Sequence, residues 1–250
     1  MQRLTALTCE ALARSLYAFS AATPNTVTIR LFKQGLHNHP RSLRSVLQEE
    51  IDALDTSADE VDAILLVYGM CGTATVGLTA RRTPLVIPRA HDCITLYLGA
   101  RDRYQEEFEA HPGTYWYSVD YMERQDKNNQ IALGAAGLEE TEAKYEEYVQ
   151  KFGQETADLL VEELRKWSQH YTRAVFIDTG LGDLERFEQM AKDKAAHENW
   201  IYERKQGNLR LLRMLVEGDW PDDEFLIVPP GHRIEQVMDA GLVRAVPVEE

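Results

Sequence analysis

The sequence has no long hydrophobic run, little positive charge and few cysteines, and each of these scarcities excludes a class of protein. No apolar stretch approaches the roughly 20 residues that a membrane-spanning helix needs, so we expect no membrane segment. Lysine and arginine number 27 against 41 aspartates and glutamates, which gives a net charge of −14. This balance leaves no basic surface for nucleic acid or an anionic membrane. It still allows a small anionic substrate held by a few local arginines.

The chain has 250 residues and only three cysteines, an odd number that does not suit a disulfide scaffold. We therefore expect free thiols and a reducing compartment, the cytoplasm. The first residues enter a strand-like segment directly and do not resemble a signal peptide. Hydrophobic residues make up 44% and charged residues 27%, which is typical of a soluble globular protein.

Buried-type apolar runs alternate with segments of helical periodicity in the first half of the chain. The strands that this pattern predicts cover residues 4–9, 26–32, 61–68 and 85–88, and the helices cover 10–19, 43–54 and 94–108. A strand–helix alternation predicts an α/β fold with a mostly parallel sheet flanked by helices in Rossmann-like layers, with room for two α/β subdomains.

The second half repeats this theme with less regularity. We expect strands at 113–119, 174–177 and 225–228, helices at 184–199 and 209–218, and a helix with a short strand at the end of the chain. An acidic helical region covers 141–170, where Gly153 divides it, and the polar stretch 123–137 is predicted to be a loop or an active-site cover. We expect a single domain, 1–250, with a loose subdomain boundary near 140–170.

The three cysteines each follow a predicted strand. Cys9 ends the first, at the start of a helix whose dipole is expected to lower the thiol pKa. Cys71 follows the third strand between Gly69 and Gly72, and Cys93 follows the fourth. Because parallel strands end at the same edge of a sheet, these thiols converge if the strands are neighbours.

The segment after the fourth strand carries Arg89, His91, Asp92 and Cys93 within five residues. Residues i and i+2 of an extended segment face the same way, so His91 and Cys93 can reach one metal while Asp92 orients a ligand. A soft set of thiolates and an imidazole suits zinc, or a [4Fe–4S] cluster with one open iron. Two other interpretations are a nucleophilic cysteine with His91 as its base, and inert core thiols.

Other polar residues at predicted strand ends complete the candidate site. His37 and Asn38 lie in a strand-to-helix loop, and Arg89 is expected to neutralise an anionic group of the substrate. Gly72 belongs to a glycine-bearing loop that lacks the Lys-Ser/Thr ending of a P-loop. A further pair, Asp178 and Thr179, either binds substrate or cofactor or caps the next helix.

Several of these segments resemble the domain-of-unknown-function family sixteen-thirty-eight of archaea and bacteria. The resemblance covers nearly the whole chain and rests on Cys9–Glu10, Gly35–Asn38, Tyr68–Gly72, Pro88–Ile94, Asp178–Leu181 and Phe225–Gly231. Members of that family are often encoded beside corrinoid-dependent methyltransferases that act on methylamines or betaines. The resemblance therefore implies an indirect link to a corrinoid. This association names no reaction.

The ligand set is also similar to that of zinc methyltransferases that activate a thiol, which use a His-x-Cys pair and a distant cysteine. Here His91 and Cys93 with Cys71 or Cys9 would match it, although the chain is too short for the barrel of those enzymes. Our leading hypothesis is a metal-dependent enzyme of one-carbon or methylated-amine metabolism, a transferase or lyase acting on a small molecule. The alternatives are an accessory protein that binds a metal or cofactor for a corrinoid protein or methyltransferase, and a metal-free Cys/His hydrolase or transferase.

Overall fold

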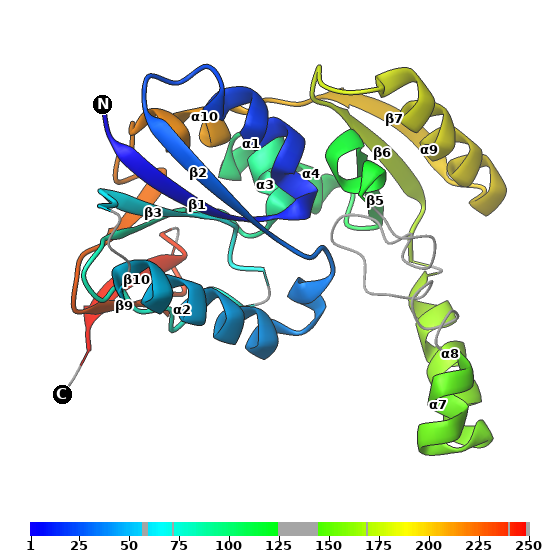
Figure 1. Ribbon diagram of the computed structural model, residues 1–250. Coiled ribbons are helices and arrows are strands. Elements are labelled where there is room, and N and C mark those ends of the chain that lie inside the picture. The colour runs from blue at the N-terminus through cyan, green and yellow to red at the C-terminus, as the bar shows by residue number, and fades with distance from the viewer. Residues whose placement is uncertain (57–59, 72, 125–144, 169, 240, 249–250) are drawn as a thin grey trace. The chain divides into compact units, whose positions relative to one another are not determined.

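The computed structural model describes the chain except for residues 57–59, 72, 125–144, 169, 240 and 249–250 (Figure 1). The described residues form two compact units. The first comprises Met1–Tyr104 and Gly207–Glu250, and the second comprises Gln105–Gln206. The predicted cover at 123–137 lies mostly outside the described residues.

A five-stranded sheet forms the centre of the first unit, in the order β2-β1-β3-β4-β8. The first four strands are parallel and β8 is antiparallel to β4. Their bounds are Arg3–Cys9 for β1, Thr26–Phe32 for β2, Ala63–Val67 for β3, Leu85–Pro88 for β4 and Phe225–Val228 for β8. Every residue of β3 and β4 is buried, as the continuous apolar runs predict for strands covered on both faces.

Helices cover both faces of this sheet (Figure 1). On one face α2 (Pro40–Thr56) buries Leu47 and Ile51 against Ile64 and Leu66 of β3. On the other lie α1 (Ala13–Ser20), α3 (Cys93–Leu98) and α10 (Arg210–Glu217). Two short 3₁₀ turns, η1 (Glu10–Leu12) and η2 (Leu36–Asn38), follow β1 and β2. This layering holds the strand ends in fixed positions.

Two expectations about the first unit are wrong. The single helix predicted at 94–108 is two helices, because Gly99 takes a φ of 79° and ends α3 before α4 (Arg101–Ala110). The carboxyl-terminal helix is instead an antiparallel hairpin of β9 (His232–Gln236) and β10 (Val243–Pro247). Side chains alternate between the two faces of this hairpin, so Ile234 and Val243 are buried in the core. This burial overrides the local helix propensity.

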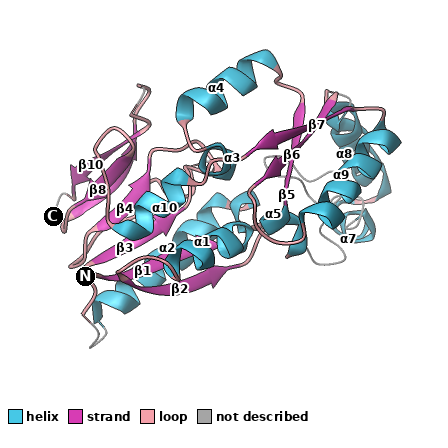
Figure 2. Ribbon diagram, turned by 90° about the horizontal axis from the view of Figure 1, so that it is seen from above, coloured by secondary structure: helices cyan, strands magenta, loops and turns pink. Residues whose placement is uncertain are grey.

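The second unit has a parallel three-stranded sheet in the order β5-β6-β7. The strands are β5 (Thr114–Ser118), β6 (Arg173–Asp178) and β7 (Ile201–Gln206), and the helices are α5 (Val119–Glu123), α7 (Tyr145–Phe152), α8 (Gln154–Ser168) and α9 (Leu184–Glu198). Gly153, with a φ of 83°, separates α7 from α8 as predicted. Figure 2 shows helices beside the strands of each unit.

The expected fold class is confirmed, since the structure is α/β with a mostly parallel central sheet flanked by helices. Among the described residues, no helix is long and apolar enough to cross a membrane.

Candidate functional site

The three cysteines lie at the ends of three neighbouring parallel strands of the first unit. Cys9 is the last residue of β1, Cys71 lies in the loop after β3, and Cys93 begins α3 just after β4. Since β1, β3 and β4 are adjacent in the sheet, all three thiols belong to its carboxyl edge. We call these three residues the three-thiol site.

Backbone hydrogen bonds join the loop after β3 to the loop after β4. The Met70 N–H donates to the Ala90 carbonyl at 2.9 Å, and the Cys71 N–H donates to the His91 carbonyl at 3.1 Å. Gly69 permits this approach, because a Cβ there would lie 2.6 Å from the backbone nitrogen of Asp92. The glycine therefore sets how closely Cys71 approaches the segment of His91 and Cys93.

The loop that carries Cys71 has a strained backbone. Cys71 has a φ of 44° and Thr73 a φ of 74°, values that L-residues other than asparagine and aspartate rarely adopt. Strain of this kind costs on the order of 1–3 kcal/mol per residue and collects at binding and catalytic sites. Gly72, a predicted site residue, lies outside the described residues.

The thiols are half-buried and crowded by neighbouring groups. Burial raises the pKa of Cys9 to about 11, with a further contribution from Glu10. Burial also raises the pKa of Cys71 and of Cys93, and the Asp92 carboxylate and the other thiols raise them further. The expectation of a lowered Cys9 pKa is therefore wrong: the backbone N–H of Ala11 does lower it, but burial outweighs this effect.

These mutual effects show that the three thiols lie within electrostatic range of one another. Within the described residues, no group of three or more His, Cys, Asp or Glu side chains is arranged so that it could hold a metal ion. The donor set of three thiols and an imidazole suits a soft metal in its chemistry.

Asp92 organises the segment between His91 and Cys93. One carboxylate oxygen accepts the N–H groups of Ile94 at 2.9 Å and Thr95 at 3.2 Å, which caps α3. The other accepts the hydroxyl of Tyr104 at 3.1 Å. The Tyr104 ring stacks on His91 with centroids 5.5 Å apart. Asp92 thus positions the imidazole through Tyr104, a residue that belongs to none of the sequence motifs.

His37 and Asn38 are half-buried in η2, whose Leu36 packs on the same core cluster as Cys9 and Cys71. The Arg89 side chain donates to the backbone carbonyls of Asp222, Gly241 and Val243, so it ties the carboxyl-terminal hairpin to β4. The guanidinium that was expected to neutralise an anionic group of the substrate therefore already donates hydrogen bonds to three backbone carbonyls.

Asp178 and Thr179 belong to the second unit, at the end of β6. The Asp178 carboxylate accepts the Gly180 N–H at 2.8 Å and an N–H of Arg204 at 2.6 Å. The helix that follows, α9, is capped instead by Asp183. Asp178 is thus held in a local turn and an ion pair.

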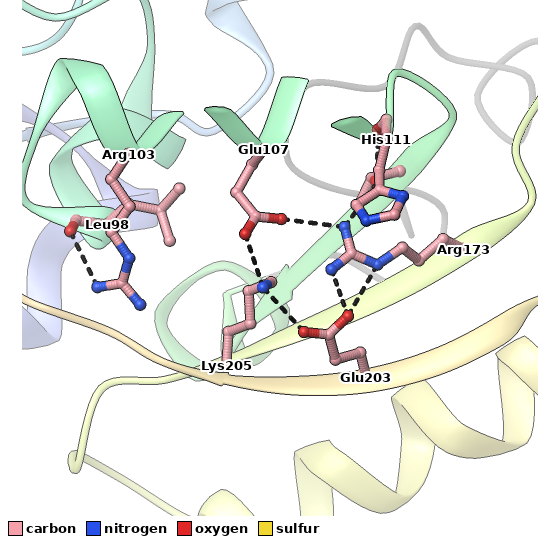
Figure 3. Close-up of polar contacts among 8 residues, drawn as sticks. Leu98, Arg103, Glu107, His111, Arg173, Glu203 and Lys205 are labelled. Carbon is pink, nitrogen blue, oxygen red and sulfur yellow. Dashed lines mark hydrogen bonds and ion pairs between the residues drawn. The ribbon is translucent and has the colours of Figure 1, made fainter. Parts of the chain in front are cut away.

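The second unit also contains a network of ion pairs that the sequence analysis did not identify (Figure 3). Arg173 binds Glu107 at 3.0 Å and also pairs with Glu203, and Lys205 lies 2.6 Å from Glu107 and 2.8 Å from Glu203. The sequence signal for this network is the pair of opposite charges at Glu203 and Lys205 on β7, since residues i and i+2 of a strand share a face. Each charge here has an opposite partner, which is typical of a structural network.

The family described as "Protein of unknown function (DUF1638)" matches residues 31–216. This span includes Cys71, His91 and Cys93, whereas Cys9 precedes it. A search of the curated proteins and of the solved structures found no match. The family match covers more than half of the chain and agrees with the resemblance seen in its motifs, so the chain belongs to the DUF1638 family.

Proposed function

We propose that the chain is a metal-dependent enzyme whose zinc ion or iron–sulfur cluster is held by Cys9, Cys71 and Cys93. One observation carries this proposal: three strands that are neighbours in the sheet carry a cysteine at, or a few residues after, their carboxyl ends, at the same edge. Only three cysteines occur in the chain, and the fold gathers all of them. Thiolates are the ligands that zinc and iron–sulfur clusters prefer.

The electrostatics of the site favour a bound cation over a free nucleophilic cysteine. A nucleophilic thiol in a metal-free enzyme has its pKa lowered by a nearby positive charge or helix amino terminus. Here burial, Asp92 and the other thiols raise the pKa of Cys71 and Cys93, so the metal-free thiols stay protonated at neutral pH. A divalent cation would reverse this balance, because it stabilises the thiolate form.

Three protein ligands would leave one coordination position for a substrate, where the metal would act as a Lewis acid or would hold a substrate sulfur. The chain's own residues would shape this position. His91, stacked on Tyr104, offers an imidazole two residues before Cys93, and Asp92 accepts hydrogen bonds from Tyr104 and from the first turn of α3, which Cys93 begins. His37 and Asn38 on η2 would supply polar contacts to the substrate. The assignment to one-carbon or methylated-amine metabolism rests on the family resemblance and remains part of the proposal.

The test is elemental analysis and visible absorption of protein purified without oxygen, followed by titration with cobalt(II). We expect either iron with sulfide and a brown colour, or stoichiometric zinc with cobalt–thiolate charge-transfer absorption after exchange. The Cys71→Ser/Cys93→Ser double variant should lose the metal, whereas His197→Ala, a change at an exposed histidine of the second unit, should keep it. Wild-type protein that neither contains metal nor binds cobalt would refute the proposal.

A further inference from the structure

Tyr68 has a buried hydroxyl group that lacks a hydrogen-bond partner among the described residues. The residue directly follows β3, and only 3% of its surface is exposed. No atom in the described part of the chain forms a hydrogen bond with its phenol oxygen. An unsatisfied buried polar group destabilises a fold, and phenylalanine would fill the same space without this cost.

Two residues of the three-thiol site, Cys9 and Cys71, lie near this phenol. Tyr68 packs in the core cluster against which Cys9 and Cys71 lie. Cys9, Cys71 and Glu10 are the ionisable side chains near it. A phenol carries its proton at neutral pH and can donate a hydrogen bond. Glu10 is engaged elsewhere: its carboxylate accepts the Gln34 N–H at 3.1 Å and lies 3.5 Å from the ammonium of Lys33.

We propose that the Tyr68 hydroxyl donates a hydrogen bond to an oxygen atom of the small substrate bound at the three-thiol site. The substrate class is a molecule with an oxygen acceptor, such as a carboxylate or carbonyl, next to its reacting atom. Thiols accept hydrogen bonds weakly, so they are poor permanent partners for a phenol. Tyr68 is thereby a substrate-binding residue, and this role rests on the proposed function of the site.

The experiment compares wild type with Tyr68→Phe, and uses acetate as the oxygen-bearing probe. Both proteins are loaded with cobalt(II), and acetate is titrated while the visible spectrum is recorded. We expect equal cobalt binding and an acetate affinity roughly 10- to 100-fold weaker in the variant, because hydrogen bonds to charged groups have about this effect. The matched control is Tyr97→Phe, which removes a buried phenol that donates to the Ala11 carbonyl and should leave acetate affinity unchanged.

The outcomes separate the two proposals. Wild type that neither contains metal nor shows cobalt–thiolate absorption overturns the metal site, whereas normal absorption with equal acetate affinity in wild type and Tyr68→Phe overturns the role of Tyr68 alone. A second measurement, urea unfolding of the metal-free proteins, tests the unpaired phenol directly. Tyr68→Phe should unfold at a higher urea concentration than wild type, and Tyr97→Phe at a lower one. A lower midpoint for Tyr68→Phe would overturn the inference, because it would show that the phenol already has a partner.

Discussion

Replacing Gly69 with alanine should separate the two loops that carry the three-thiol site. The new Cβ would lie 2.6 Å and 2.7 Å from the nitrogen and Cα of Asp92, and 2.9 Å from the Ala90 carbonyl oxygen. These are backbone atoms that cannot rotate away. An ordinary contact begins at 3.4 Å, so the loops must part by about 0.8 Å, the difference between 3.4 Å and 2.6 Å.

This movement would break or weaken both hydrogen bonds between the loops, Met70 N–H to Ala90 and Cys71 N–H to His91. Each such bond contributes about 0.5–1.5 kcal/mol, and overpacking adds a comparable cost, so we expect about 3 kcal/mol of destabilisation. Cys71 would also move away from Cys93. Cobalt affinity of the Gly69→Ala variant should therefore fall by at least about tenfold, which corresponds to 1.4 kcal/mol.

Hydrogen exchange of the Met70 and Cys71 amides measures the effect locally, and urea unfolding measures it globally. Both amides should exchange faster in Gly69→Ala. The control is Gly77→Ala, where the new Cβ comes no closer than 3.7 Å to the Arg44 side chain and only the positive φ is unfavourable. That variant should lose about 1–2 kcal/mol and keep slow exchange at Met70 and Cys71. Unchanged exchange and unfolding in Gly69→Ala would refute the reasoning.

Three further predictions concern single side chains. Asp92→Ala should cost about 1–2 kcal/mol in urea unfolding, because it removes the cap of α3, and an unaltered midpoint would contradict that role. Burial raises the Asp178 pKa, but hydrogen bonds from Arg204 and Gly180 outweigh burial and lower it. The stability that this ion pair adds is present above the unfolded pKa of about 3.9 and is lost as pH falls through the folded pKa. In Arg204→Gln, the free energy of unfolding should therefore change less with pH below about pH 4 than it does in wild type. Arg173→Met should destabilise the second unit by about 2–3 kcal/mol, since it leaves Glu107 and Glu203 with Lys205 alone, and a loss below about 0.5 kcal/mol would count against a structural network.

Local patterns were enough to predict the sheet and the strand ends. The runs at Ile64–Val67 and Leu85–Ile87 are apolar at every position and short, which favours strands buried on both faces. Once β1, β3 and β4 were assigned, their parallel packing placed Cys9, Cys71 and Cys93 at one edge. The carboxyl-terminal hairpin could not be predicted in this way, because Ile234 and Val243 are fixed by burial in a core formed by distant segments.

The chemistry of individual side chains depended on contacts that no local pattern contains. The sign of the Cys9 pKa shift was predicted from its position before a helix, but crowding by distant residues outweighs that effect. Tyr104 lies 12 residues from Asp92 along the chain, and its hydrogen bond could be found only in the folded structure. Arg89 looked available in the sequence, and its carbonyl partners are more than 130 residues away.

The two units differ in how their polar groups are balanced, and this difference is why we propose the function for the first unit. In the second unit, Arg173 and Lys205 each meet two carboxylates, so the network stabilises itself without a ligand. At the carboxyl edge of the first sheet, the structure instead holds a strained Cys71, crowded thiols with raised pKa values, and an unpaired Tyr68 hydroxyl. The positive φ of Cys71 and the unpaired phenol each lower stability. A bound cation would stabilise the thiolates, and an oxygen-bearing ligand would give the phenol a partner. Folds retain such local costs where binding compensates for them.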